Sequence, residues 1–165
     1  MRRILLALTL VTGCGAGGDQ GNGAAPQAAV DTSRLTGLYE GEGVRPSQIC
    51  MIDRVAGDTG FGLVVWGANL HSCSGSGQAL REGNVLRLTM AGDQSCAIEA
   101  RIEGTTVTLP ETVPAGCAYY CGAQAKLGGG TFTKVGSTPA DALKAADLVG
   151  EPLCSGMNPR PSADP

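Results

Sequence analysis

Apolar side chains recur at every second position through much of the segment from Leu35 to Cys154. The clearest run is Cys96–Glu103, in which Cys96, Ile98, Ala100 and Ile102 share one face and Glu99, Arg101 and Glu103 share the other. This period is that of a β-strand with one buried and one solvated face. Glycine-containing turns separate such runs about every eight to twelve residues. The segment is therefore predicted to be an antiparallel β meander.

The same alternation occurs in Val85–Met90 and in Gly60–Trp66, where Phe61, Leu63 and Val65 fall together. Weaker alternation predicts further strands at 36–43, 48–54, 77–81, 105–109, 121–127 and 131–135. Consecutive hairpins close most economically into an up-and-down barrel, because closure removes the unpaired strand edges. We therefore predict an all-β domain, a small disulfide-stapled barrel of eight or nine strands. A two-sheet sandwich is the alternative.

One short helix is predicted after the strands. The sequence Thr138-Pro139-Ala140-Asp141 offers an N-cap, a proline at the first helical position and an acid at the third. The helix is expected to continue to about Leu148 and to end at Gly150. Its apolar residues form one narrow stripe, which is expected to pack on the barrel wall or to plug one end.

The first 13 residues have the pattern of a signal peptide. Arg2 and Arg3 precede the apolar run Ile4–Val11, which is well short of the roughly 20 residues that span a bilayer. The run ends in Val11-Thr12-Gly13-Cys14, which resembles the lipobox of bacterial lipoproteins. The resemblance implies that Cys14 becomes the acylated first residue of the mature chain, carrying diacylglycerol and palmitate. The alternative is a plain secretory signal in which Cys14 is incidental.

The same resemblance implies a location. Because Gly15 rather than Asp follows Cys14, the lipoprotein rule implies transfer to the outer membrane of a Gram-negative cell, anchored by lipid at the periplasmic face. Several acyl chains anchor a protein far more firmly than one chain does. The predicted contact with the membrane is therefore the lipid alone.

Six cysteines remain after Cys14, and an even set in an exported chain predicts three disulfides without an unpaired thiol. They are Cys50, Cys73, Cys96, Cys117, Cys121 and Cys154. Counting strands as alternating in direction places the first five at one end of the barrel, opposite tight turns near Gly57, Gly83, Gly104 and Gly129. Fifteen connectivities are possible. The pairing that we predict is Cys73 with Cys96, Cys50 with Cys121 and Cys117 with Cys154.

Both flanks of the domain lack an apolar pattern. Residues 14–34 are predicted to be a flexible linker after the lipidated cysteine, because Val30 is the one large aliphatic residue between Gly15 and Ser33. A flexible segment of this length reaches about 25 Å. Residues 155–165 contain Pro159, Pro161 and Pro165 and are predicted to be a disordered tail. The folded domain is expected to cover residues 35–154.

Charge and chemistry exclude several functions. Loss of the signal peptide leaves ten basic against 15 acidic residues, and the three lysines are dispersed at 126, 134 and 144, which argues against nucleic-acid binding. His71 is the one histidine. Together with Cys73, Cys117 and Cys121 it could form a zinc or copper site only if the thiols are free, and the sequence contains no C-x-x-C pair. No nucleophile motif occurs. We therefore predict a non-enzymatic protein without cofactor or metal.

Tyr119 and Tyr120 are the candidate binding residues, because they lie between Cys117 and Cys121 in a loop that disulfides would hold rigid. Tyrosines held at low entropic cost are common anchors in binding sites. The alternative is that one or both rings cap the barrel as core. Trp66 is a third candidate, with the same ambiguity.

The predicted architecture resembles the small disulfide-bonded periplasmic inhibitors of lysozyme. The stretch Thr133-Lys134-Val135-Gly136 is similar to a Thr-Lys-Gly stretch of that family, with Val135 inserted. An acidic barrel facing a basic enzyme is electrostatically sensible. The leading hypothesis is a lipid-anchored envelope protein that binds a protein or small ligand. The alternatives are a structural envelope lipoprotein without a ligand site, an inhibitor-like protein, and an enzyme or metal carrier.

Overall fold

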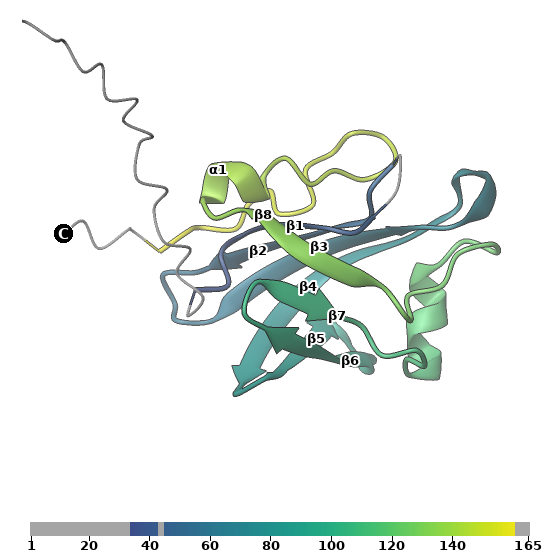
Figure 1. Cartoon of the computed structure of the whole chain (residues 1–165), viewed down its shortest axis with the longest axis horizontal. Coiled ribbons are helices and arrows are strands. Elements are labelled where there is room, and N and C mark those ends of the chain that lie inside the picture. The colour runs from purple at the N-terminus through teal and green to yellow at the C-terminus, as the bar shows by residue number, and fades with distance from the viewer. Residues whose placement is uncertain (1–33, 43–44, 161–165) are drawn as a thin grey trace, which may run out of the picture.

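The computed structural model describes residues 34–42 and 45–160. Within them, eight antiparallel strands pair in chain order, and the last pairs with the first to close a barrel (Figure 1). The strands are β1 (Gly37–Glu40), β2 (Gln48–Asp53), β3 (Thr59–Trp66), β4 (Ser72–Glu82), β5 (Val85–Met90), β6 (Asp93–Glu103), β7 (Thr106–Thr108) and β8 (Thr131–Gly136). The predicted all-β barrel is confirmed and the sandwich alternative is excluded. The signal peptide, Cys14 and most of the linker lie outside the described residues.

The barrel interior is a filled core. On β6, Cys96, Ile98, Ala100 and Ile102 are buried and the intervening charged residues are exposed, as the alternation predicts. Both phenylalanines, Phe61 and Phe132, are fully buried in this core. A barrel of eight strands is just wide enough for side chains to fill. The surfaces that a ligand could reach therefore lie on the outside of the barrel and at its ends.

Tyr39 is the one buried tyrosine of the described core. Its hydroxyl donates a hydrogen bond to the Leu35 carbonyl oxygen at 2.9 Å, which fixes the chain just before β1. Burial, with a smaller contribution from the negative charge of Asp53, raises the pKa of Tyr39 above its ordinary value. The side chain is thus neutral and hydrogen-bonded, as a buried phenol must be.

The outer wall over β1, β2 and β3 is also covered, by the segment that follows β8. A second buried cluster, which we call the outer-wall cluster, joins the strands to this segment. It consists of Leu38, Cys50, Ile52, Ala142, Ala145 and Cys154, with Leu153 and Met157 packed against it. Figure 1 shows the yellow C-terminal segment lying across these strands. Because both faces of β2 are buried, its sequence is a continuous apolar run rather than an alternation.

Helix α1 (Pro139–Ala142) is shorter than predicted. Its start is as expected, since the Thr138 side chain accepts from the Asp141 amide and the Asp141 side chain accepts from the Thr138 amide. The prediction of a helix to about Leu148 is wrong, because the chain instead folds back and the Leu153 amide donates to the Ala145 carbonyl oxygen. The turn against β1 and β2 buries Ala142 and Ala145, whereas the larger apolar residues Leu143, Leu148 and Val149 are exposed.

The predicted disordered tail does not begin at Ser155. Residues 155–160 continue over the barrel, where Pro159 forms a β-bridge with Arg54 and the Arg160 amide donates to the Asp53 carbonyl oxygen. Met157 packs into the outer-wall cluster. These contacts extend the domain beyond its expected boundary at residue 154, and residues 161–165 lie outside the described part.

The predicted strand at 121–127 is absent. Gly129 therefore lies at the end of the barrel away from Gly57, Gly83 and Gly104, not at the same end as predicted. A single connection, residues 109–130, joins β7 to β8, and it contains a 3₁₀ helix, η2 (Ala115–Tyr120), instead of a strand. Residues 121–127 contribute only the isolated bridge of Cys121 to Cys73. Gly57, Gly83 and Gly104 do lie in short turns at the opposite end, as strand alternation predicts.

Gly60 and Gly62 on β3 mark where the C-terminal segment approaches most closely. A Cβ atom at Gly62 would lie 2.7 Å from the Leu153 carbonyl oxygen, and one at Gly60 would lie 2.6 Å from the Met157 sulfur. The glycines alternate with the inward-facing Phe61 and Leu63, so they form the outward side of β3. Their lack of side chains lets the segment lie directly on the strand backbone.

We expect Gly62→Ala to lower the free energy of unfolding by about 1–3 kcal/mol, because the added methyl group must displace the Leu153 backbone. Urea unfolding under non-reducing conditions measures this loss. In a chain carrying Cys50→Ala and Cys154→Ala, the segment is no longer tied down and the cost should shrink. An equal cost in both backgrounds would mean that the glycine serves β3 itself rather than the covering segment.

Candidate functional site

Two disulfides brace one end of the barrel, which we call the disulfide pole. It comprises the β3–β4 turn (residues 67–71), the β5–β6 turn (residues 91–92) and the β7–β8 connection (residues 109–130). Cys73–Cys121 ties the connection to the start of β4, and Cys96–Cys117 ties it to β6. The connection is long and mostly irregular, so these bonds replace the strand pairing that fixes the rest of the chain.

The third disulfide, Cys50–Cys154, lies on the outer wall. The expectation of three disulfides is confirmed, but all three predicted pairings are wrong. Cys50 is not at the pole either, because it occupies the middle of β2 and faces outward between Ile49 and Met51, which face the core. Strand parity assigns turns to an end of the barrel, but it does not place a residue within a strand.

Helix η2 presents different residues on its different sides. A 3₁₀ helix has three residues per turn, so Ala115, Ala118 and Cys121 follow one another along one side. Cys117 is buried and Gly116 lies against Ser95 of β6. On the other two sides of the helix, Tyr119 follows Gly116 and Tyr120 follows Cys117. The short helix therefore separates the tyrosines from the side that carries the two alanines.

Tyr120 is partly a core residue. Its ring packs against the barrel core, and its hydroxyl donates a hydrogen bond to Asp93 Oδ2 at 3.2 Å. Burial and the negative charge of Asp93 raise the pKa of Tyr120, while hydrogen bonds from Ser95, with a smaller one from Tyr120, lower the pKa of Asp93. The ring is thus fixed by the barrel, as the alternative reading of this loop expects.

Tyr119 is the most exposed large apolar residue of the described chain, at 88%. Its ring meets the Tyr120 ring edge to face, with centroids 5.5 Å apart and planes at 86°. This is a favoured arrangement of aromatic rings. An exposed ring is therefore held against a ring that is itself fixed, on a helix braced by two disulfides.

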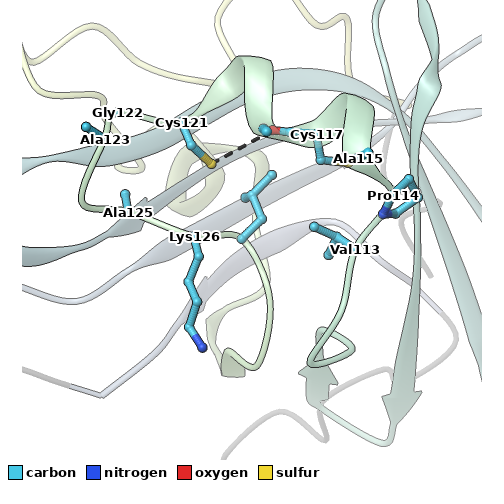
Figure 2. A pocket seen from close by; sticks show the side chains of 11 residues that line it. Val113, Pro114, Ala115, Cys117, Cys121, Gly122, Ala123, Ala125 and Lys126 are labelled. Atoms are coloured by element: carbon cyan, nitrogen blue, oxygen red, sulfur yellow. Dashed lines mark hydrogen bonds between the residues drawn. The ribbon is translucent and has the colours of Figure 1, made fainter.

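An apolar cavity lies on the alanine side of η2 (Figure 2). Its volume is about 380 Å³. The walls come from two stretches of the β7–β8 connection and include Val113, Pro114, Ala115, Cys117, Ala118, Cys121, Gly122, Ala123, Ala125, Lys126 and Leu127. Lys126 supplies the one charged side chain of this lining. This cavity is not recognisable from the sequence, because small residues without a periodic pattern carry no signal.

The β3–β4 turn holds a second feature that the sequence analysis missed. Asn69 and Leu70 both have positive φ angles, 52° and 61°, and the His71 amide donates to the Ala68 carbonyl oxygen. A leucine rarely adopts this conformation. Gln124 braces the turn, since its Oε1 accepts from Asn69 Nδ2 at 2.7 Å. Leu70 is 65% exposed at the tip.

Trp66 lies at the end of β3, half-buried, with the Arg45 guanidinium 4.1 Å from its ring centre. It borders a groove shared with Gly67, Gln124 and Lys126, on the other side of the 124–126 segment from η2. Trp66 and the two tyrosines thus all belong to the same end of the barrel. They are not shown to form one aromatic surface, because neither tyrosine lines the groove that Trp66 borders and the one ring pair among the described residues is that of Tyr119 and Tyr120.

The metal-binding alternative lacks ligands in the described part of the chain. Its six cysteines are all in disulfides, and no group of three or more His, Cys, Asp and Glu residues comes together among residues 34–42 and 45–160. His71 lies beside Gly122. Among these same residues there is also no helix of the length and hydropathy that crossing a bilayer requires.

The stretch that resembles the lysozyme inhibitors lies on β8, where its lysine makes internal contacts. Lys134 Nζ donates to the Arg34 carbonyl oxygen at 2.8 Å and lies 5.2 Å from the centre of the Tyr39 ring. These contacts hold the residues before β1 against the barrel. The Lys134 side chain is therefore used for packing in this structure.

Comparison with known proteins finds no relative. No protein family matches the chain, no curated protein is similar to it, and no solved structure matches its fold.

Proposed function

We propose that this chain is a lipid-anchored protein of the bacterial cell envelope that binds a protein or small ligand through the disulfide pole and catalyses no reaction. The observation that carries the binding proposal is Tyr119, a ring that is 88% exposed, contacts the Tyr120 ring edge to face and stands on a helix whose backbone two disulfides hold. A partner that contacts such a ring does not have to order it, so little binding energy is lost.

Three disulfides support the envelope location, since such bonds persist in exported proteins and are rare in the cytosol. The lipobox-like sequence ending at Cys14 supports the anchor. Leu70 supports a recognition role for the same pole, because strained backbone conformations gather at functional sites. A structural lipoprotein without a ligand site needs neither the strained Leu70 nor the exposed ring of Tyr119.

The inhibitor-like alternative has less support. A small acidic barrel is compatible with a basic enzyme partner. However, Lys134 of the resembling stretch is engaged with Arg34 and Tyr39. Binding of purified lysozyme to the immobilised domain should therefore be measured alongside binding of proteins from envelope extract.

We expect Tyr119→Ala to weaken partner binding at least about thirtyfold, as the loss of an aromatic hot spot does. The melting temperature should remain unchanged, because the ring buries little of its own surface in the domain. Replacing Tyr119 by a photo-crosslinking phenylalanine analogue identifies the partner in envelope extract. The control position is Val55, which is 65% exposed in the opposite β2–β3 turn. Identical cross-links from both positions would refute a site at the pole.

We expect Cys14→Ser to abolish metabolic labelling with palmitate, because no thiol remains to be acylated. The chain should then either be released from the membrane or remain uncleaved. Membrane fractionation and intact mass measure the two effects. The matched control is Thr12→Ala, which keeps the lipobox-like pattern and should be labelled normally. A Cys14→Ser chain that is cleaved and still membrane-bound would place the anchor elsewhere.

A further inference from the structure

The cavity of Figure 2 has apolar walls that the barrel holds in place. Cys117 and Cys121 both line it, and each is disulfide-bonded to a strand, so the η2 wall cannot move away from the barrel. Val113 and Leu127 contribute the larger side chains of the opposite wall and pack against the barrel core. A cavity between anchored walls is preformed, as small-molecule sites usually are.

Lys126 gives this apolar cavity a charged rim. Figure 2 shows its side chain extending from the 122–127 segment, across the opening from Val113 and Pro114. Among the described residues, no carboxylate forms an ion pair with its ammonium group, whereas Lys144 is paired with Asp141. Lys126 is exposed, so its charge is available to a ligand that enters the cavity.

We propose that this cavity binds a free small amphiphile with one aliphatic chain and one anionic group, of the chemistry of a medium-chain carboxylate. The carboxylate would meet Lys126, and the chain would lie between the alanine side of η2 and the wall of Val113 and Leu127. Apolar contacts provide most of the affinity and the charge selects the head group.

The size of the cavity favours a free single-chain molecule over a bilayer lipid. Its volume of about 380 Å³ is near the lower end of the range of about 300–1,000 Å³ for small-molecule sites. A phospholipid with two long chains exceeds this volume. The inference is independent of protein binding through Tyr119, because that ring is absent from the cavity lining.

Titration of the soluble domain, residues 34–165, with sodium octanoate tests the proposal, with amide NMR shifts as the readout. Disulfide formation and folding of this fragment are first verified by intact mass and by the dispersion of its amide spectrum. We expect saturable shifts confined to residues 113–127 and their direct neighbours. Octylammonium chloride has the same chain with the opposite charge, and it should bind more weakly by at least about fivefold.

Three variants separate the apolar and the charged contributions. Ala118→Leu on η2 and Ala123→Leu on the 122–127 segment each add a large side chain to the lining and should abolish octanoate binding; both residues are exposed, so folding should be retained. Lys126→Gln should weaken octanoate about fivefold and leave octylammonium unchanged or tighter. The matched controls are Ala140→Leu on α1 and Lys144→Gln, which should have no effect on octanoate binding.

Several results would overturn the inference. These are octanoate shifts spread over the barrel surface, equal affinity for octanoate and octylammonium, or full binding by Ala118→Leu and Ala123→Leu. Binding to phosphatidylglycerol vesicles without binding of free octanoate would assign the surface to a membrane instead. Tyr119→Ala should bind octanoate like the wild type, so failure of the protein-binding proposal leaves this test intact.

Discussion

Joint replacement of Cys50 and Cys154 by alanine is expected to lower the free energy of unfolding by about 4–5 kcal/mol. The two residues are 104 positions apart, so their bond closes a loop that contains nearly the whole barrel. The chain-entropy model gives the largest stabilisation for the longest loop. The loss also includes packing, because both cysteines are fully buried in the outer-wall cluster.

The matched control is Cys96→Ala with Cys117→Ala, which opens a loop of 21 residues at the pole. Its expected cost is about 3 kcal/mol, and its sulfurs are equally buried. Urea unfolding of both variants under non-reducing conditions measures the difference. A larger loss for the Cys96–Cys117 variant would show that local strain or packing, rather than loop length, governs these bonds.

The barrel interior was predictable from sequence because it obeys one period. Ile98 and Glu99 on β6 differ in burial simply because successive side chains of a strand point to opposite faces. The covered outer wall was not predictable in this way. The run Ile49–Ile52 is apolar on both faces, and the glycines at 60 and 62 carry no sign of what lies on them. The explanation of both features lies about 90 to 110 residues further along the chain, in Leu153 and Met157.

The candidate site was predictable in part. The position of Tyr119 and Tyr120 between two cysteines located a braced loop, but their different burial depends on Asp93 of β6, which is 27 residues away from Tyr120. The strained turn at Asn69 and Leu70 escaped because such turns are normally recognised by glycine. The cavity escaped because its lining consists mostly of small residues without a periodic pattern, and because the disulfides that fix η2 to β4 and β6 have partners that the sequence does not specify.

Phe61→Ala is expected to cost about 3–5 kcal/mol of unfolding free energy. Phe61 has no exposed surface, and it faces the barrel core from the middle of β3. With six aromatic residues in the whole chain, few large side chains are available to close the space that the ring leaves. A loss of this size is a large fraction of the total stability of a small domain.

Two further variants make the Phe61 prediction specific to the interior. Phe61→Leu keeps most of the volume and should cost less than about 1.5 kcal/mol. Leu80→Ala truncates a large aliphatic side chain on β4 that is 57% exposed, and it should change the free energy of unfolding by no more than about 0.5 kcal/mol. If Phe61→Ala cost no more than Leu80→Ala, the ring would not be a structural element of the core. Because Phe61 does not line the cavity beside η2, the folded fraction of Phe61→Ala should still bind octanoate with wild-type affinity, which separates the stability of the barrel from recognition at its pole.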